Sequence, residues 1–191
     1  ITIETLVKFN TASSYYGLVM KSNPGVWNDG WGLATSFNGK NFDFWPNTWG
    51  TTNMITSNTT ITPNVWYHVA ATYNSSTGFA RMYINGKLDT TKFIGSLIAN
   101  SAHNLSLGFD GSTYHFNGTL DEVRIWNVER DPCQIASFMN AEITSTASGL
   151  VANYHFNQGN AGISNPTVTT LVDATGNGHN GHHPYAGCSG Y

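Results

Sequence analysis

The sequence predicts an all-β protein, a two-sheet antiparallel β-sandwich with one short helix near residues 132–140. Only 10% of the residues are charged whereas aromatic residues reach 13%, and abundant β-branched, aromatic and turn-forming residues favour strands over helices. Apolar and polar residues alternate along several short segments. Turn-forming residues recur at intervals of roughly eight to twelve positions, the spacing typical of a sandwich. At 191 residues the chain is long enough for one well-buried core.

The alternation is clearest in two segments. In residues 2–9 every second side chain, from Ile3 to Phe9, falls on one side, as in a half-buried strand. Residues 66–73 alternate in the same way, which places the side chains at 67, 69, 71 and 73 on one face. Further strands are expected at residues 16–22, 30–37, 41–45, 51–57, 79–84, 103–109, 119–127 and 149–156.

Two Asn-Gly dipeptides mark tight hairpin turns. They are Asn38-Gly39, between the strands expected at 30–37 and 41–45, and Asn85-Gly86, after the strand expected at 79–84. Both central residues of a type I′ turn have positive φ, which Asn and Gly tolerate best. Both positions are therefore expected to reverse the chain.

A single helix is predicted at residues 132–140. Asp131 can cap its first turn, Pro132 suits the first helical position, and Gln134 stands three residues after the cap, as in a capping box. At helical spacing, the side chains expected to face the sandwich are Ile135, Phe138 and Met139.

Three segments resemble a known family signature. They are Gly118–Asn127, with the sequence Gly-Thr-Leu-Asp-Glu-Val-Arg-Ile-Trp-Asn, residues 66–73 and residues 83–88. Together they resemble the laminin-G-like and pentraxin-like jelly rolls of the concanavalin A-like lectin/glucanase superfamily. The match covers most of residues 1–140. It implies a jelly-roll fold and a recognition module, without naming the ligand.

The domain organisation follows from the same resemblance. Residues 1–191 are expected to form a single domain, a fragment of a larger protein, because the chain begins inside a strand. The family usually has a strand before the position of Ile1. We therefore expect residues 141–191 to supply a C-terminal strand and turn segment that completes the sandwich, or else an open sheet edge.

Composition excludes two classes of partner. A net charge of -3 and a pI near 6.1 give no basic footprint for nucleic acid. No stretch approaches the roughly 18 to 20 apolar residues of a membrane-spanning helix, so no membrane insertion is expected. The Asn-, Thr- and Ser-rich, Lys-poor composition is typical of an extracellular or cell-surface protein.

The two cysteines, Cys133 and Cys188, permit one disulfide. In the chain-entropy model a bridge that closes so long a loop would stabilise the fold by about 4 kcal/mol. The alternative is two unpaired thiols. We expect the bridge, because Cys188 lies in a glycine-rich tail that needs an anchor.

An oxygen-rich set of residues indicates calcium. Asp173, Asn177 and Asn180 lie in a glycine-rich turn, and Asp121 is available from the signature strand. Calcium prefers six to eight oxygen ligands from carboxylates, amides and carbonyls. The resemblance adds that jelly rolls of this family often hold one structural Ca2+. The alternative is a network of Asx turns without metal.

Tryptophans in predicted loops indicate a carbohydrate site. Exposed indole planes suit the apolar faces of sugar rings, and amides bind their hydroxyls. The candidates are Trp27, Trp45 and Trp49, with Asn47 between the last two. The alternative is that these side chains fold down to cover the ends of the sandwich.

Catalysis finds little support. A retaining glycosidase needs two carboxyl groups about 5 Å apart. The adjacent pair Asp121-Glu122 is expected to point to opposite faces of its strand, and the sequence contains no hydrolase elbow, phosphate loop or zinc-protease motif. The sequence therefore favours a non-catalytic carbohydrate-binding or adhesion module, whose partners are a glycan or cell-surface polysaccharide and other domains of its parent protein. The alternatives are a structural or protein-binding spacer of an adhesin and, less favoured, a jelly-roll polysaccharide lyase or glycoside hydrolase.

Overall fold

Two antiparallel sheets form the body of the protein in the computed structural model, which describes residues 1–95, 101–143, 147–160, 165 and 167–182. The six-stranded sheet contains β1 (Thr2–Phe9), β6 (Trp66–Asn74), β7 (Phe79–Ile84), β8 (Lys87–Phe93), β10 (Gly118–Trp126) and β11 (Leu150–Tyr154). The five-stranded sheet contains β2 (Gly17–Lys21), β3 (Trp31–Thr35), β4 (Phe42–Trp45), β5 (Ile55–Thr56) and β9 (Ser106–Leu107). The predicted two-sheet sandwich is confirmed.

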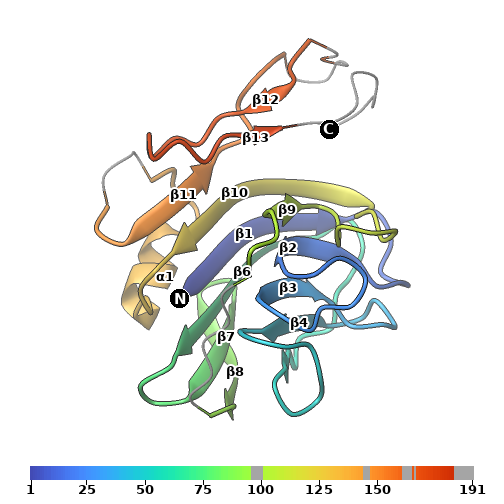
Figure 1. Cartoon of the computed structure of the whole chain (residues 1–191), viewed down its shortest axis with the longest axis vertical. Helices are drawn as coiled ribbons and strands as arrows, with labels where there is room; N and C mark the ends of the chain where they lie inside the picture. The colour runs from blue at the N-terminus through green and yellow to red at the C-terminus, as the bar shows by residue number, and fades with distance from the viewer. Residues whose placement is uncertain (96–100, 144–146, 161–164, 166, 183–191) are drawn as a thin grey trace.

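The order of strands is β11-β10-β1-β6-β7-β8 in the six-stranded sheet and β5-β4-β3-β2-β9 in the five-stranded sheet. In Figure 1 the larger sheet curves over the smaller one. Strands β5 and β9 are each two residues long, shorter than the expected 51–57 and 103–109. Gly108 has φ +65, outside the strand region, and ends β9 at its C-terminal side.

The hydrophobic core lies between the two sheets. The expected alternation in β1 holds, since Ile3, Val7 and Phe9 are fully buried there. The odd-numbered face of β6 also packs into this core, from Tyr67 to Tyr73. Period-two alternation thus assigned the buried faces of both strands correctly.

The Asn85-Gly86 turn joins β7 to β8 as expected. Both residues have positive φ, 51° and 74°, and β7 and β8 pair in antiparallel register from Ile84↔Lys87 onward. The side chain of Asn85 also accepts a hydrogen bond from the backbone N–H of His68 at 2.9 Å, which ties the turn to β6.

A β-bulge in β10 overturns one expectation about the acidic pair. Leu6 pairs with Asp121 while Glu4 pairs with Arg124, so β10 carries one residue more than β1 at this point, and Glu122 has φ +48. Leu120 and Val123 both pack toward the core between the sheets. Asp121 and Glu122, which lie between them, therefore both remain on the outer face, and the expectation of opposite faces is wrong.

Helix α1 (Pro132–Phe138) covers part of that outer face. Its capping box forms as predicted, because the Asp131 carboxylate accepts from Gln134 N at 2.8 Å and the Gln134 side chain accepts from Asp131 N at 3.1 Å. Ile135 is fully buried against outer-face side chains of β6 and β7. Phe138, expected to face the sandwich, is the last residue of α1 and is instead 42% exposed, with the Arg130 guanidinium 5.5 Å from its ring centroid.

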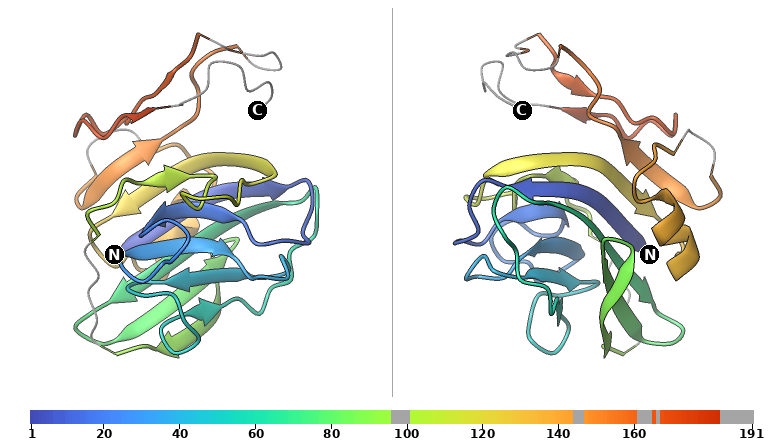
Figure 2. Two further views of the ribbon diagram at one scale, coloured as in Figure 1. Left: turned by 45° about the vertical axis from the view of Figure 1, so that its right-hand side comes forward. Right: turned by 180° about the vertical axis from the view of Figure 1, so that it is seen from behind.

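The C-terminal segment divides into two parts. Strand β11 pairs with β10 at the edge of the six-stranded sheet. Strands β12 (Thr170–Leu171) and β13 (Gly181–His182) pair only with each other, and both views in Figure 2 show them beyond β11, away from the sandwich. None of the described helices is long and apolar enough to span a membrane.

The predicted disulfide has one partner in the described part of the chain. Cys133 is a free, exposed cysteine in α1. Cys188 lies outside the described residues.

Candidate ligand site on the five-stranded sheet

A second apolar cluster lies on the outer face of the five-stranded sheet. Met20 in β2, Ala34 in β3 and Trp45 in β4 belong to it, whereas their strand neighbours Leu33 and Phe44 belong to the core between the sheets. At Gly32 a Cβ atom would collide with the Trp45 indole and would lie 2.7 Å from Met20 Sδ. The indole therefore lies across β3 at a position that requires glycine.

Five aromatic side chains form a continuous patch over this cluster. Tyr15 contacts three of the others, with ring centroids 5.0 Å from Trp27, 5.3 Å from Phe37 and 5.2 Å from Tyr114. Trp49 completes the patch at 5.4 Å from Phe37 and 6.1 Å from Trp27. We call these five residues the aromatic patch.

The aromatic patch has a buried base and an exposed rim. Tyr15 and Trp27 are 2% and 8% exposed, whereas Phe37 and Tyr114 are 56% and 40% exposed. Trp49 is half-buried. Exposed aromatic rings that rest on buried ones are well fixed, so they can stack on a ligand with little loss of side-chain entropy.

The backbone at Trp27 is strained. Its φ of 51° is rare for a bulky residue and is characteristic of functional sites. Two hydrogen bonds hold it, from Trp27 N to Asn23 O at 2.9 Å and from Trp49 N to Trp27 O at 2.8 Å. The Asp29 carboxylate closes the same loop by accepting from Asn23 N at 2.6 Å. The two tryptophan loops are therefore fixed to each other.

Polar atoms with unused hydrogen-bonding capacity lie in this layer. Among the described residues, Tyr15 Oη, Trp27 Nε1 and Trp45 Nε1 are buried without a protein hydrogen-bond partner. Buried polar groups are nearly always paired in native proteins. Because all three atoms are buried, they lie beneath the ring surface that a ligand would touch.

Two buried carboxylates accompany the aromatic patch. Asp43 in β4 is 4% exposed and accepts a hydrogen bond from Thr56 Oγ1 at 2.7 Å, and burial raises its pKa to about 6. Asp110 is 1% exposed, and its Oδ1 accepts from the backbone N–H groups of residues 112, 113 and 114, which fixes the turn that carries Tyr114. Burial, and then the charges of Asp110 and Asp43, raise the pKa of Tyr15.

A cleft of about 320 Å³ adjoins the outer-face cluster. Met54 belongs to both, since it lines the cleft and packs against the cluster that contains Trp45. Thr56, the partner of Asp43, also lines the cleft. The rest of the lining comes from Thr51, Ile55, Thr90, Thr91 and Lys92. The cleft therefore adds hydroxyl groups beside the outer-face cluster that carries the aromatic patch.

The residues predicted to bind a ligand differ in how exposed they are. Trp45 is fully buried in β4, so the expectation of a free rim indole is wrong for this residue, and it supports the patch from below. Trp27 is nearly buried, and Trp49 and Asn47 are half-buried at the edge. Hence, of the three predicted tryptophans, Trp49 is the one most able to touch a ligand.

Sequence reasoning missed the two most exposed rings of the patch. Phe37 was assigned to the end of a strand, although its position beside Asn38-Gly39 places it in a turn where an apolar ring is hard to bury. Tyr114 lies in a segment without alternation, and no local pattern distinguishes it.

The predicted calcium turn is closed by its own hydrogen bonds. The Asp173 carboxylate accepts from Asn153 N, Thr175 N, Thr175 Oγ1 and His179 N, at 2.8 to 3.2 Å. Burial alone would raise the pKa of Asp173, but these hydrogen bonds hold it below the ordinary value. Such a carboxylate has few lone pairs left for an ion.

The other members of the predicted set are also engaged or distant in the fold. Asn180 Oδ1 accepts from Asp173 N at 2.9 Å, and Asn177 Nδ2 donates to Val151 O at 2.9 Å. Asp121 lies in the bulge of β10, where its carboxylate accepts from Glu122 N at 2.9 Å. The geometry of the turn thus fits the Asx-turn alternative better than an ion cage.

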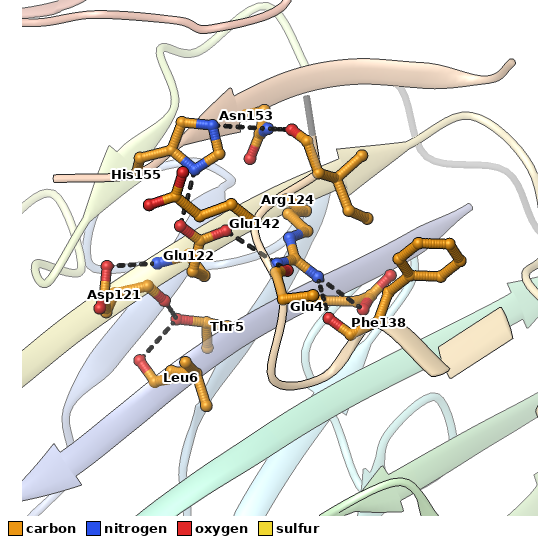
Figure 3. A network of polar contacts seen from close by, with 12 residues as sticks. Glu4, Thr5, Leu6, Asp121, Glu122, Arg124, Phe138, Glu142, Asn153 and His155 are labelled. Atoms are coloured by element: carbon orange, nitrogen blue, oxygen red, sulfur yellow. Dashed lines mark hydrogen bonds and ion pairs between the residues drawn. The ribbon is translucent and has the colours of Figure 1, made fainter. Parts of the chain in front are cut away.

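A different group could hold a metal ion on geometry alone. Glu122, Glu142 and His155 present ligand atoms that lie within 4.8 Å of one another, beside Asp121 in Figure 3. However, Glu122 accepts from Arg124 Nη2 at 2.8 Å and pairs with His155 Nδ1 at 2.6 Å. Both of its carboxylate oxygens are therefore used.

The histidine tautomer also opposes metal binding. Asn153 Nδ2 donates to Ile143 O at 2.7 Å and stands 3.3 Å from His155 Nε2. An amide N–H directed at Nε2 requires a lone pair there, so the imidazole proton lies on Nδ1, toward Glu122. A metal on Nδ1 would need the opposite arrangement. The group is a charge-paired network.

A buried ionic layer continues along the same face. Glu4 is fully buried and accepts from Arg130 Nη1 at 2.8 Å, with His68 Nε2 at 3.3 Å and Arg124 Nη1 at 3.9 Å. Burial would raise the pKa of Glu4, but the hydrogen bonds and charges of His68 and Arg130 lower it. This layer joins β1, β6 and β10 to the segment before α1.

Comparison with known proteins identifies the family. Residues 1–136 match a family profile described as the concanavalin A-like lectin/glucanases superfamily. This segment is well over half of the 191 residues, and the chain therefore belongs to this superfamily. The resemblance of the signature segments is thus confirmed. No curated protein sequence matches the chain significantly.

Several solved structures share the fold. A Bacteroides ovatus protein whose suggested role is carbohydrate binding aligns with 92% of this chain at a TM-score of 0.71 and 20% identity, and the chain spans 49% of that protein's length. A heptameric SAP-like pentraxin from Limulus polyphemus aligns with 73% of this chain over 70% of the pentraxin chain, at a TM-score of 0.54 and 18% identity. The CBM40 of a Ruminococcus gnavus IT-sialidase, bound to α2,3 sialyllactose, aligns with 72% of this chain over 80% of the CBM40 chain. The TM-score is 0.56 and the identity 14%.

Proposed function

We propose that this domain is a non-catalytic carbohydrate-binding module that holds a glycan on the aromatic patch. The observation that carries the proposal is the pair of exposed rings, Phe37 and Tyr114, fixed on the buried rings of Tyr15 and Trp27. Sugar rings present apolar faces to such platforms, and their hydroxyls suit the neighbouring amide, indole and carboxylate groups.

The structural relatives support the class of ligand. The CBM40 structure contains a sialylated sugar, and the ligand-binding domain of botulinum neurotoxin serotype D was solved with N-acetylneuraminic acid. Their identities to this chain, 14% and 18%, support a shared fold. Carbohydrate binding by the present chain rests on its own aromatic patch.

The non-catalytic part of the proposal rests on the acidic residues. Asp121 and Glu122 share the outer face of the six-stranded sheet, but Glu122 is held by Arg124 and His155 on both oxygens. A general acid or nucleophile must be free to reach a bond in the substrate. Asp43 and Asp110, beside the aromatic patch, are 4% and 1% exposed.

The setting of the module is part of the same proposal. The Lys-poor, Asn- and Thr-rich composition supports an extracellular or cell-surface protein with adhesive function. Binding of Ca2+ by Asp121, Asp173, Asn177 and Asn180 stays a prediction, against which the closed hydrogen bonds of Asp173 weigh. Its test is the melting temperature with CaCl2 and with EDTA, and equal values would contradict a structural ion.

The central test replaces one exposed ring. Binding to a panel of immobilised polysaccharides and an oligosaccharide array is measured for the wild type and for Phe37→Ala. We expect affinity to fall at least about tenfold, because ring truncation at a binding hot spot costs more than 1.4 kcal/mol. The melting temperature should change little, since Phe37 is 56% exposed.

The matched control is Phe93→Ala. Phe93 is 63% exposed on β8 and contacts only Phe79 among the described aromatic rings. Glycan binding should be unchanged in this variant. If Phe37→Ala leaves glycan binding unchanged, or if the wild type binds no glycan, the module is better explained as a spacer or protein-binding domain.

A further inference from the structure

The charges under the aromatic patch are negative. Asp43 stands on the outer face of β4, paired with Ala34 across the ladder and two residues before Trp45. Asp110 supports the turn that carries Tyr114. Both carboxylates act on the hydroxyl of Tyr15, whose ring is the base of the patch. A ligand on the aromatic patch would therefore lie above two buried carboxylates.

The arginines of the sequence are used elsewhere. Arg124 and Arg130 are buried with Glu4 on the six-stranded sheet, and Arg81 pairs with Glu129 at its far strands. Recognition of a sugar carboxylate relies on the forked guanidinium group, which donates two parallel hydrogen bonds. The aromatic patch has no such group among the described residues.

Two lysines belong to segments that border the patch. Lys40 is exposed in the turn that follows Phe37. Lys92 lines the adjoining cleft, where its Nζ donates to the carbonyl oxygens of Thr51 at 2.6 Å and Met54 at 2.8 Å. Two of the three ammonium protons of Lys92 thus serve the protein backbone.

The remaining polar groups suit uncharged hydroxyls. The indole Nε1 atoms of Trp27 and Trp45, the Tyr15 hydroxyl and the Asp43 carboxylate are buried beneath the patch, so they act on a ligand through their dipoles and charge and not by direct contact. Thr51, Thr56 and their neighbours add hydroxyls in the cleft. An uncharged hydroxyl can pair with the hydroxyl groups of the cleft and is not repelled by the buried charges of Asp43 and Asp110, whereas a ligand carboxylate is repelled by both.

We infer that the aromatic patch is specific for neutral glycans and discriminates against sialylated and uronic-acid glycans, with Asp43 as a specificity-determining residue. This inference rests on the proposed function. It would distinguish the present chain from the relatives whose structures contain sialic acid, because two carboxylates and no arginine accompany the aromatic patch among the described residues.

The test uses pairs of probes with a neutral and an acidic member: the polygalacturonate pair differs by one charge per sugar, and the lactose pair by one added sialic acid. Lactose is compared with 3′-sialyllactose, and fully methyl-esterified polygalacturonate with polygalacturonate, in a panel that also contains neutral cello-, xylo- and manno-oligosaccharides. Neutral members should be bound, and their acidic partners about tenfold more weakly at low salt. Added salt should reduce that ratio, because screening weakens the repulsion.

The outcomes separate the two proposals. Tighter binding of the acidic members would overturn the inference while the proposed function stands. If no probe is bound, the proposed function fails and the inference fails with it. Equal binding within each pair would also overturn the inference.

A variant tests the role of Asp43 directly. Asp43→Asn keeps an acceptor for Thr56 and removes the charge, so the neutral-to-acidic ratio should fall several-fold. Asp131→Asn is the matched control, since Asp131 is exposed at the cap of α1 on the opposite sheet and Asn also caps helices. An unchanged ratio in Asp43→Asn would contradict the assignment of Asp43.

Discussion

The buried carboxyl of Asp43 gives a quantitative prediction about stability. Burial raises its pKa to about 6 in the folded protein, from an ordinary value of 3.8. Between these two values the folded protein holds a proton that the unfolded chain has released. The free energy of unfolding therefore falls as the pH rises through this interval, and the full penalty is present above about pH 6.

The size of the penalty follows from the difference between the two pKa values. This difference, about 6 minus 3.8, corresponds to about 3 kcal/mol, because each pKa unit equals about 1.4 kcal/mol. Asp43→Asn cannot ionise and keeps an oxygen that accepts from Thr56. Relative to the wild type, the variant should therefore gain about 3 kcal/mol of stability between pH 3.5 and pH 7.

The measurement is urea unfolding followed by far-UV circular dichroism at several pH values. The quantity of interest is the difference between the stabilities of the variant and the wild type, because other titrating groups cancel in it. Asp131→Asn should show no such trend. A flat difference for Asp43→Asn across this pH range would refute the claim that the Asp43 carboxylate is desolvated.

Three further predictions concern other parts of the structure. Glu4→Gln should destabilise the protein by about 3 kcal/mol in urea unfolding, because it leaves Arg130 with a buried, unbalanced charge; a loss below about 1 kcal/mol would contradict the buried ion pair. Gly32→Ala should lower both the melting temperature and glycan affinity, since the new methyl group displaces the Trp45 indole, and unchanged values would show that the indole lies elsewhere. Thiol titration with and without reductant tests the expected Cys133 bridge, and a fully reactive thiol before reduction would exclude it.

Much of the fold could be predicted from local patterns. The alternation in β1 and β6 gave the buried faces, and the capping residues gave the start of α1 at Pro132. These patterns are determined by neighbours in sequence, which is why they suffice. The bulge at Glu122 could not be predicted, because it is a property of how β10 pairs with a strand more than a hundred residues away.

Only part of the candidate site could be predicted, because the rest depends on contacts between residues distant in sequence. Trp27 and Trp49 were recognised as loop tryptophans, and both belong to the aromatic patch. Whether Trp45 is exposed depends on where the loop of Trp27 lies over β3 and β4, which no local pattern reports. Phe37 was overlooked because its ring contacts residues distant in sequence, such as Tyr15.

The extra residue in β10 has a consequence for how this strand could vary. Without Glu122, the order of inward and outward side chains from Leu120 to Val123 would become regular, and the ladder with β1 would lose nothing. The partners left stranded would be Arg124 and His155, which bind the two oxygens of its carboxylate. Strand pairing therefore tolerates the insertion, and the hydrogen bonds of Arg124 and His155 depend on it.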